Sequence, residues 1–230
     1  MKQADHDFHI GCVIMASGAS RRFGGGKNKL LELLGEREVI LHTAENVRAA
    51  GLFPVIVTRS EEVAELVKRN GYECVLHHDP EKSATIRQGL EFLSGSRDAG
   101  CLFIPGDQPL IRPDSIRRMM EAFRKSIKKD QETKESGGSI VRLSIKGEGK
   151  SPVLFPSSVF PKLLALKGND GGSALLKAER EEDLPPVLLV EAEEEAELWD
   201  CDTLSDLQRI RNFYTLNRIS DCSFPGFSIK

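Results

Sequence analysis

A run of small and basic residues between positions 17 and 29 has the composition of a phosphate-binding loop. The segment reads SGASRRFGGGKNK and follows an apolar stretch. Small residues let the backbone approach a phosphate chain, and the exposed N–H groups of such a loop form an anion-binding nest. Arg22 and Lys29 add positive charge where a triphosphate would lie. The Gly-Lys-Ser/Thr of a P-loop is absent, and a flexible basic turn explains the run equally well when it is taken alone.

A second candidate is Asp107, in the segment PGDQP that follows the apolar run at 101–104. A carboxylate at the end of a buried strand is costly unless it meets a cation or hydrogen-bond donors. Mg²⁺ prefers one or two carboxylates together with phosphate oxygens, so Asp107 is a candidate magnesium ligand. A turn in which the aspartate caps its own backbone is the competing interpretation.

A third candidate is the acidic pair in the segment WDCDT, formed by Asp200 and Asp202. Side chains at positions i and i+2 of an extended segment point to the same face. We assign Asp200 to the metal as a second carboxylate, and we assign Asp202 or Thr203 to the cap of the helix that follows.

These candidates are positioned by strands and helices that alternate over the first 125 residues. The predicted strands cover residues 9–16, 53–58, 72–77 and 101–104, and the predicted helices cover residues 36–50, 61–70, 83–93 and 113–125. The strands are continuous apolar runs, which favours a mostly parallel sheet with helices on both faces, a Rossmann-like three-layer α/β/α fold. Because ligands bind at the carboxyl ends of such strands, the loops 17–29 and 105–110 should open on one edge of the sheet.

The second half of the chain predicts further elements around the same sheet. Strands are expected at 140–145, 152–155 and 187–190, with helices at 157–166 and 173–179 and a last helix after residue 199. We interpret the polar residues 126–138 as an insertion loop, the acidic run 191–197 as a solvated connector, and residues 215–230 as a tail without a clear pattern. The prediction is one domain over 1–230, with its core at about 9–214.

Composition excludes several classes of partner. The net charge is −3 and no half of the chain is strongly basic, so no nucleic-acid partner is indicated. The apolar runs are too short to span a membrane, and the polar N-terminus does not resemble a signal peptide. Five cysteines without a paired spacing fit a reducing compartment and no zinc site, so we expect a cytoplasmic protein.

Five motifs together resemble a known family. The segment MASGASRRFGGGKNKLL is similar to the loop Leu-Ala-Ala/Gly-Gly-x-Ser-x-Arg-x-Gly-x-x-Lys of nucleotidyltransferases, and GDQP, GKSPVLFP, GNDGGSALL and DCDT resemble their later motifs in the same order. The resemblance covers residues 10 to about 212. It is closest to the molybdenum cofactor cytidylyltransferase-like family and implies the fold of nucleotide-diphospho-sugar transferases.

The resemblance implies a reaction and its residues. CMP would pass from CTP to the terminal phosphate of molybdenum cofactor with release of pyrophosphate, and a molybdenum hydroxylase would receive the product. Arg22, Lys29 and Asp107 would be catalytic, with Mg²⁺ held by Asp107 and Asp200. Transfer of this kind depends on positioning and on charge neutralisation more than on a protein nucleophile.

The resemblance also implies a nucleotide-binding set, whose members are Ala16, Ser17, Gly18, Ser20, Lys27, Ser83, Thr85 and Arg87. For the last three, a helix N-terminus with its caps is the competing interpretation. Lys27 competes with Lys29 because extra glycines precede the lysine, and we prefer Lys29 because Leu30 and Leu31 follow it as in the family.

Three departures from the family pattern leave the substrates open. Ser17 replaces a small Ala or Gly, Asn169 stands where the family has Asp, and Ser173 stands where it has Arg. The last two lie on the expected acceptor side, so one alternative is a transferase that acts on a sugar phosphate or another phosphorylated alcohol. A second alternative is a non-catalytic accessory protein that delivers the cofactor.

Overall fold

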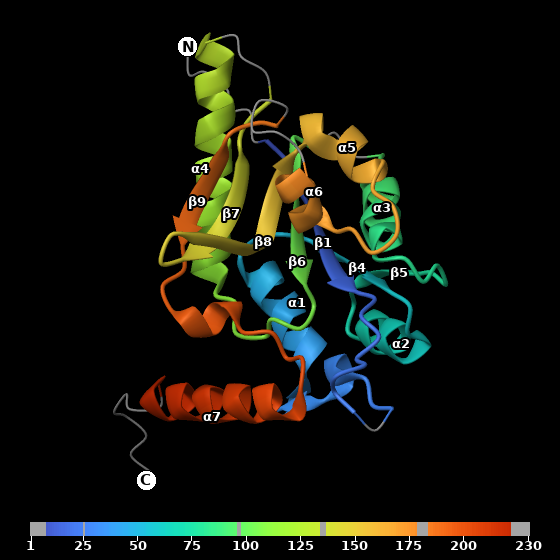
Figure 1. Cartoon of the computed structure of the whole chain (residues 1–230). Helices are drawn as coiled ribbons and strands as arrows, with labels where there is room; N and C mark the ends of the chain where they lie inside the picture. The colour runs from blue at the N-terminus through green and yellow to red at the C-terminus, as the bar shows by residue number, and fades with distance from the viewer. Residues whose placement is uncertain (1–7, 25, 96–97, 134–136, 179–183, 222–230) are drawn as a thin grey trace.

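The computed structural model describes residues 8–221 apart from 25, 96–97, 134–136 and 179–183. Its centre is a seven-stranded sheet in the order β5-β4-β1-β6-β8-β7-β9 (Figure 1). The strands are β1 (Ile10–Ala16), β4 (Val55–Thr58), β5 (Glu73–Leu76), β6 (Gly100–Pro105), β7 (Ile140–Ile145), β8 (Glu148–Pro156) and β9 (Val187–Glu191). Among these strands β8 alone runs opposite to the others, so the prediction of a mostly parallel sheet is confirmed.

Helices cover both faces of this sheet. They are α1 (Val39–Ala49), α2 (Glu61–Arg69), α3 (Lys82–Leu93), α4 (Pro113–Thr133), α5 (Phe160–Leu164), α6 (Gly172–Ala178) and α7 (Leu204–Asp221). Successive β1 side chains alternate between two cores: Cys12 and Ile14 belong to the core with α1, α2 and α4, while Val13 belongs to the core with α3, α5 and α6. The expected three-layer α/β/α architecture is therefore confirmed.

Shorter elements complete the chain. They are the 3-10 helices η1 (Lys29–Leu31), η2 (Ser157–Val159) and η4 (Glu195–Leu198), and the strand pair β2 (Leu33–Leu34) and β3 (Arg37–Glu38). The strand pair precedes α1, so that helix begins three residues after the predicted start at residue 36. No helix in the described ranges is both long and apolar enough to cross a membrane.

The structure corrects the prediction of an insertion loop at 126–138 for residues 126–133, whereas residues 134–136 lie outside the described part of the chain. Helix α4 continues to Thr133, because its apolar stripe continues beyond residue 125: Phe123 and Ile127 are four residues apart and both are buried. Ser126 lies on the inner side as well, where its Oγ donates to the Phe123 carbonyl and accepts from the Ser139 amide. Lys128 and Lys129 are exposed, so their charges lie on the outer face of the helix.

The prediction of an unpatterned tail from residue 215 is also wrong for its first part. Helix α7 runs to Asp221, and the remaining residues, 222–230, lie outside the described part of the chain. Buried Leu207 and Ile210 hold the helix on the core, and the Arg211 guanidinium donates to the Leu33 carbonyl at 2.7 and 3.0 Å. These contacts are with distant parts of the chain, which explains why the local pattern gave no signal.

The acidic run 191–197 is not a uniformly solvated connector. Its last member, Glu197, is the third residue of η4 and is 1% exposed. The Glu197 carboxylate accepts hydrogen bonds from the backbone amides of Arg112, Glu193 and Glu194, at 3.1, 2.9 and 3.3 Å. A buried carboxylate with three N–H donors is a structural clamp, and here it ties the start of α4 to the last segment of the chain.

Candidate active site

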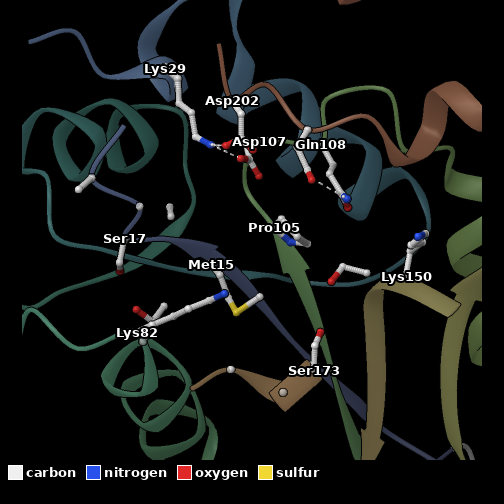
Figure 2. A pocket seen from close by; sticks show the side chains of 18 of the residues that line it. Met15, Ser17, Lys29, Lys82, Pro105, Asp107, Gln108, Lys150, Ser173 and Asp202 are labelled. Atoms are coloured by element: carbon white, nitrogen blue, oxygen red, sulfur yellow. Dashed lines mark hydrogen bonds and ion pairs between the residues drawn. The ribbon is translucent and has the colours of Figure 1, made fainter. Parts of the chain in front are cut away.

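The two loops singled out in the sequence leave neighbouring strands at the same edge of the sheet. Strands β1 and β6 pair in parallel, with Met15 opposite Pro105, so residue 17 and residue 107 begin their loops side by side. Between the loops lies a cleft of about 1040 Å³ (Figure 2). In that view Lys29, Asp107 and Asp202 occupy one end of the cleft, and Lys82 and Ser173 lie at the other.

Local contacts fix the shape of the glycine-rich loop. Phe23 is 2% exposed and anchors the middle of the loop in the core, and its amide donates to the Ser20 carbonyl at 3.0 Å. Ser20 adopts a positive φ of 49° and its Oγ accepts from the Lys29 amide at 3.3 Å. Asn28 then caps η1 through its Oδ1. The loop therefore returns to the cleft at Lys29.

Of the two candidate lysines in the loop, Lys29 is the one that enters the cleft. Its Nζ donates to Asp107 and, at 2.7 Å, to Oδ1 of Asp202, and the residue is only 8% exposed. Burial alone would lower the pKa of Lys29, but the two carboxylates more than offset this, so the pKa is raised and the amine is charged at neutral pH. Lys27 has a 67% exposed side chain whose Nζ lies 3.8 Å from Oε1 of Glu32, and it does not line this cleft.

Asp202 faces the cleft and does not cap α7, which corrects the sequence assignment. Its Oδ2 accepts from the Arg22 guanidinium at 2.7 Å, so Arg22 and Lys29 share one carboxylate. The cap is Thr203, as the alternative had it: Thr203 Oγ1 accepts from the Asp206 amide at 3.1 Å and the Asp206 side chain accepts from the Thr203 amide at 2.8 Å. The i, i+2 spacing was the signal for Asp202, because it placed both acids on one face.

Asp200 also lines the cleft, on the side of Gln108. Its Oδ1 accepts from Nε2 of Gln108, a residue that is 3% exposed, at 3.0 Å. Desolvation of the carboxyl group, with the negative charges of Asp107 and Asp202 nearby, raises the pKa of Asp200 to about 6. The Cys201 amide donates to the Asp107 carbonyl at 2.9 Å and so holds the two acidic segments together.

The donor set suits a divalent cation that also binds phosphate. No group of three or more His, Cys, Asp or Glu side chains forms a metal cluster in the described ranges. Three aspartates line the cleft, and Asp202 is paired with Arg22 and Lys29. The other two, Asp107 and Asp200, make up the number of carboxylates that Mg²⁺ uses when phosphate oxygens complete its coordination. The pKa of Asp200 is raised first by desolvation and then by the charges of Asp107 and Asp202, and a cation beside the carboxyl group would favour its charged form. The residues present therefore fit the expected metal.

The predicted nucleotide-binding residues divide into two groups. Those that line the cleft are Ala16, Ser17, Gly18, Ser20 and Thr85. Lys27, Ser83 and Arg87 do not line it, which corrects their assignment. Ser83 is 1% exposed and its Oγ donates to Glu81 next to the start of α3, and Arg87 is two residues beyond Thr85, about 200° around the helix.

Several lining residues had no signal in the sequence. Lys82 enters from the first position of α3, and Arg142, Lys150 and Lys177 enter from β7, β8 and α6. The expected acceptor residues Asn169 and Ser173 line the same cleft. The Arg142 guanidinium donates to the Gly149 carbonyl, and burial lowers its pKa. These cations come from elements far apart in the chain, so only the folded sheet brings them together.

The chain matches a family model described as the MobA-like NTP transferase domain over residues 12–184, which is more than half of its length. The chain therefore belongs to this family. Its mostly parallel sheet flanked by helices is the fold of nucleotide-diphospho-sugar transferases.

Individual relatives are more distant. The chain is 32% identical over 115 residues to a probable molybdenum cofactor guanylyltransferase of Thermococcus sibiricus, which covers 50% of this chain and 56% of the relative. It is 35% identical over 112 residues to 3-deoxy-manno-octulosonate cytidylyltransferase 2 of Actinobacillus pleuropneumoniae, covering 47% and 43%. The chain thus spans about half the length of these curated relatives.

A solved structure extends the likeness in fold. Rv0371c of Mycobacterium tuberculosis, in a complex with manganese, superposes with a TM-score of 0.68 over 89% of this chain and 98% of that one, at 23% identity.

Proposed function

We propose that this protein transfers CMP from CTP to the terminal phosphate of molybdenum cofactor and releases pyrophosphate, in the cytoplasm, for use by a molybdenum hydroxylase. The observation that carries the transfer chemistry is the position of Lys29, whose buried amine joins the glycine-rich loop to Asp107 and Asp202. The choice of CTP rests on the GDQP segment and the later motifs, which resemble those of cytidylyltransferases.

In this reaction an oxygen of the acceptor phosphate attacks the α-phosphorus of CTP. The new oxygen–phosphorus bond forms as the bond from the α-phosphorus to the bridging oxygen breaks, and that oxygen leaves with pyrophosphate. The acceptor phosphate is already anionic at neutral pH, so no strong general base is needed. Positioning and charge neutralisation supply the catalysis.

Residues of the chain divide this work between two ends of the cleft. Lys29 and Arg22, which already bind a carboxylate in this structure, would donate to the departing pyrophosphate. Asp107 and Asp200 would hold a divalent cation, Mg²⁺ in our proposal, which neutralises phosphate oxygens when bound. At the other end, Arg142 and Lys150 would offset the charge of the acceptor phosphate.

The test is a pyrophosphate-release assay with molybdenum cofactor and Mg²⁺, in which CTP, GTP, ATP and UTP are compared. We expect turnover with CTP at least about tenfold above that with GTP, a difference of about 1.4 kcal/mol in transition-state binding. Faster turnover with GTP, or equal rates with all four nucleotides, would remove the cytidylyltransferase assignment.

A second candidate is cytidylyl transfer to a sugar phosphate or another phosphorylated alcohol. The observation that favours it is the pair Asn169 and Ser173, which both line the acceptor end of the cleft and replace the Asp and Arg of the resembled family. An acceptor screen with labelled CTP separates the two candidates, since turnover with a sugar phosphate and none with molybdenum cofactor would select this one.

A further inference from the structure

The hydroxyl group of Ser17, at the base of the cleft, has two polar neighbours. Ser17 Oγ donates to the Val57 carbonyl at 3.2 Å and lies 2.9 Å from Nε2 of His77. A hydroxyl carries one hydrogen, and a carbonyl oxygen can only accept. With the Ser17 hydrogen directed to Val57, the hydrogen between Ser17 and His77 comes from Nε2 of the imidazole, which also lies 3.5 Å from Thr85 Oγ1.

The surroundings of His77 support this direction. The residue is 7% exposed at the end of β5, and its amide donates to the Thr58 carbonyl at 3.0 Å. Its Nδ1 is buried and has no partner within the described ranges. With the hydrogen on Nε2, Nδ1 is a bare acceptor, whereas the opposite tautomer would strand a buried N–H donor, which native structures rarely do.

The charge state of His77 agrees with a single ring hydrogen. Burial lowers the pKa of His77, the positive charge of Arg59 lowers it further, and the opposing effect of Asp79 is smaller, with a minor lowering from His78. The imidazole is therefore neutral at physiological pH.

We propose that His77 positions Ser17 so that Ser17 Oγ acts only as an acceptor toward the cleft and selects a nucleotide base with an exocyclic amine. The inference rests on the proposed function and on Ser17, which belongs to the expected nucleotide-binding set and lines the cleft, lying against the nucleobase of the bound nucleotide. Cytosine presents an amine at its 4-position, and that amine would donate to Ser17. Uracil has a carbonyl oxygen there, so two acceptors would face each other and one would stay unpaired.

The experiment measures the affinities of the intact protein for CTP and UTP in Mg²⁺ by titration calorimetry. The variants are Ser17→Ala, His77→Leu and His77→Gln, with His78→Gln as a matched control on the adjacent exposed histidine. We expect the CTP:UTP affinity ratio to fall about tenfold in Ser17→Ala and His77→Leu, the size of one lost hydrogen bond in a partly buried site. It should be preserved in His77→Gln, because glutamine Nε2 can donate as the imidazole does.

The ratio distinguishes this role from a merely structural one. If His77 only supported the fold, His77→Leu would weaken CTP and UTP equally and leave the ratio unchanged, which would overturn the inference. An unchanged ratio in Ser17→Ala, which keeps the backbone and loses only an oxygen, would overturn it as well. Wild-type protein that binds CTP and UTP equally would have the same consequence.

A failure of the proposed function gives a different result. If the wild-type protein binds GTP and not CTP, the cytidylyltransferase assignment fails, and the same variants are compared with GTP and inosine triphosphate, which lacks the exocyclic amine of guanine. A fall of the GTP:inosine triphosphate ratio in Ser17→Ala would support the inference, and an unchanged ratio would overturn it.

Discussion

Replacing Lys29 with methionine tests the geometry of the cleft most directly, because Lys27 provides a matched control two residues away. Methionine keeps much of the length of the lysine side chain and removes its charge. The Lys29 side chain is 10% exposed and joins Asp107 to Asp202, so its amine acts where solvent screens little. Loss of one such preorganised donor typically costs about 3–4 kcal/mol of transition-state stabilisation, so we expect turnover to fall about 100- to 1000-fold.

Lys27→Met should behave differently, since Lys27 is a surface residue. Its side chain is 67% exposed and its one carboxylate neighbour, Glu32, is 3.8 Å away, and exposed pairs of this kind contribute at most about 1 kcal/mol. That energy corresponds to less than about fivefold in rate.

Pyrophosphate release from CTP and acceptor, measured in Mg²⁺, compares the two variants, and thermal unfolding shows that both remain folded. The mechanism is refuted if Lys29→Met retains near wild-type turnover, or if Lys27→Met is as damaging as Lys29→Met. A loss of turnover in Lys27→Met alone would indicate that Lys27, and not Lys29, binds the phosphate chain.

Two further predictions concern stability. The pKa of Asp200 is raised to about 6, so between pH 4 and 6 the folded state binds more protons at this group than the unfolded state, and stability due to Asp200 falls as the pH rises. Thermal unfolding from pH 4 to 7 should show this fall in stability in the wild-type protein without divalent metal, and a smaller fall with Mg²⁺. The part of the fall that is due to Asp200 should be absent in Asp200→Asn. A variant with the same pH profile as the wild-type protein would contradict the assignment. Glu197→Ala should lower the free energy of unfolding by about 3 kcal/mol, because it removes the acceptor of three backbone N–H groups, while Glu193→Ala at an exposed ion pair should cost under about 1 kcal/mol. Urea denaturation measures both, and equal losses would show that the buried clamp has no special role.

The sequence by itself determined the layout of the sheet and the edge at which chemistry occurs. Continuous apolar runs separated by helical patterns require strands that are buried on both faces, and parallel pairing then brings the loops after residues 16 and 105 to one edge. These features are local in the chain, because the periodicity of a strand or helix and the composition of a loop can each be recognised within a short segment of sequence. The motif order identified the family in the same way.

The tertiary structure decided which side chains occupy the cleft. Lys29 lies in the cleft because its amine contacts Asp107 and Asp202, which are 78 and 173 positions away in the chain. The same contact shows that Asp202 faces the cleft and does not cap the last helix. The pairing of Ser17 with His77 spans 60 positions and left no local pattern. Hydrogen bonds and burial depend on distances between segments that come together only when the sheet has formed. The sequence therefore indicates the candidate residues, and the packed structure determines which of them lie in the cleft.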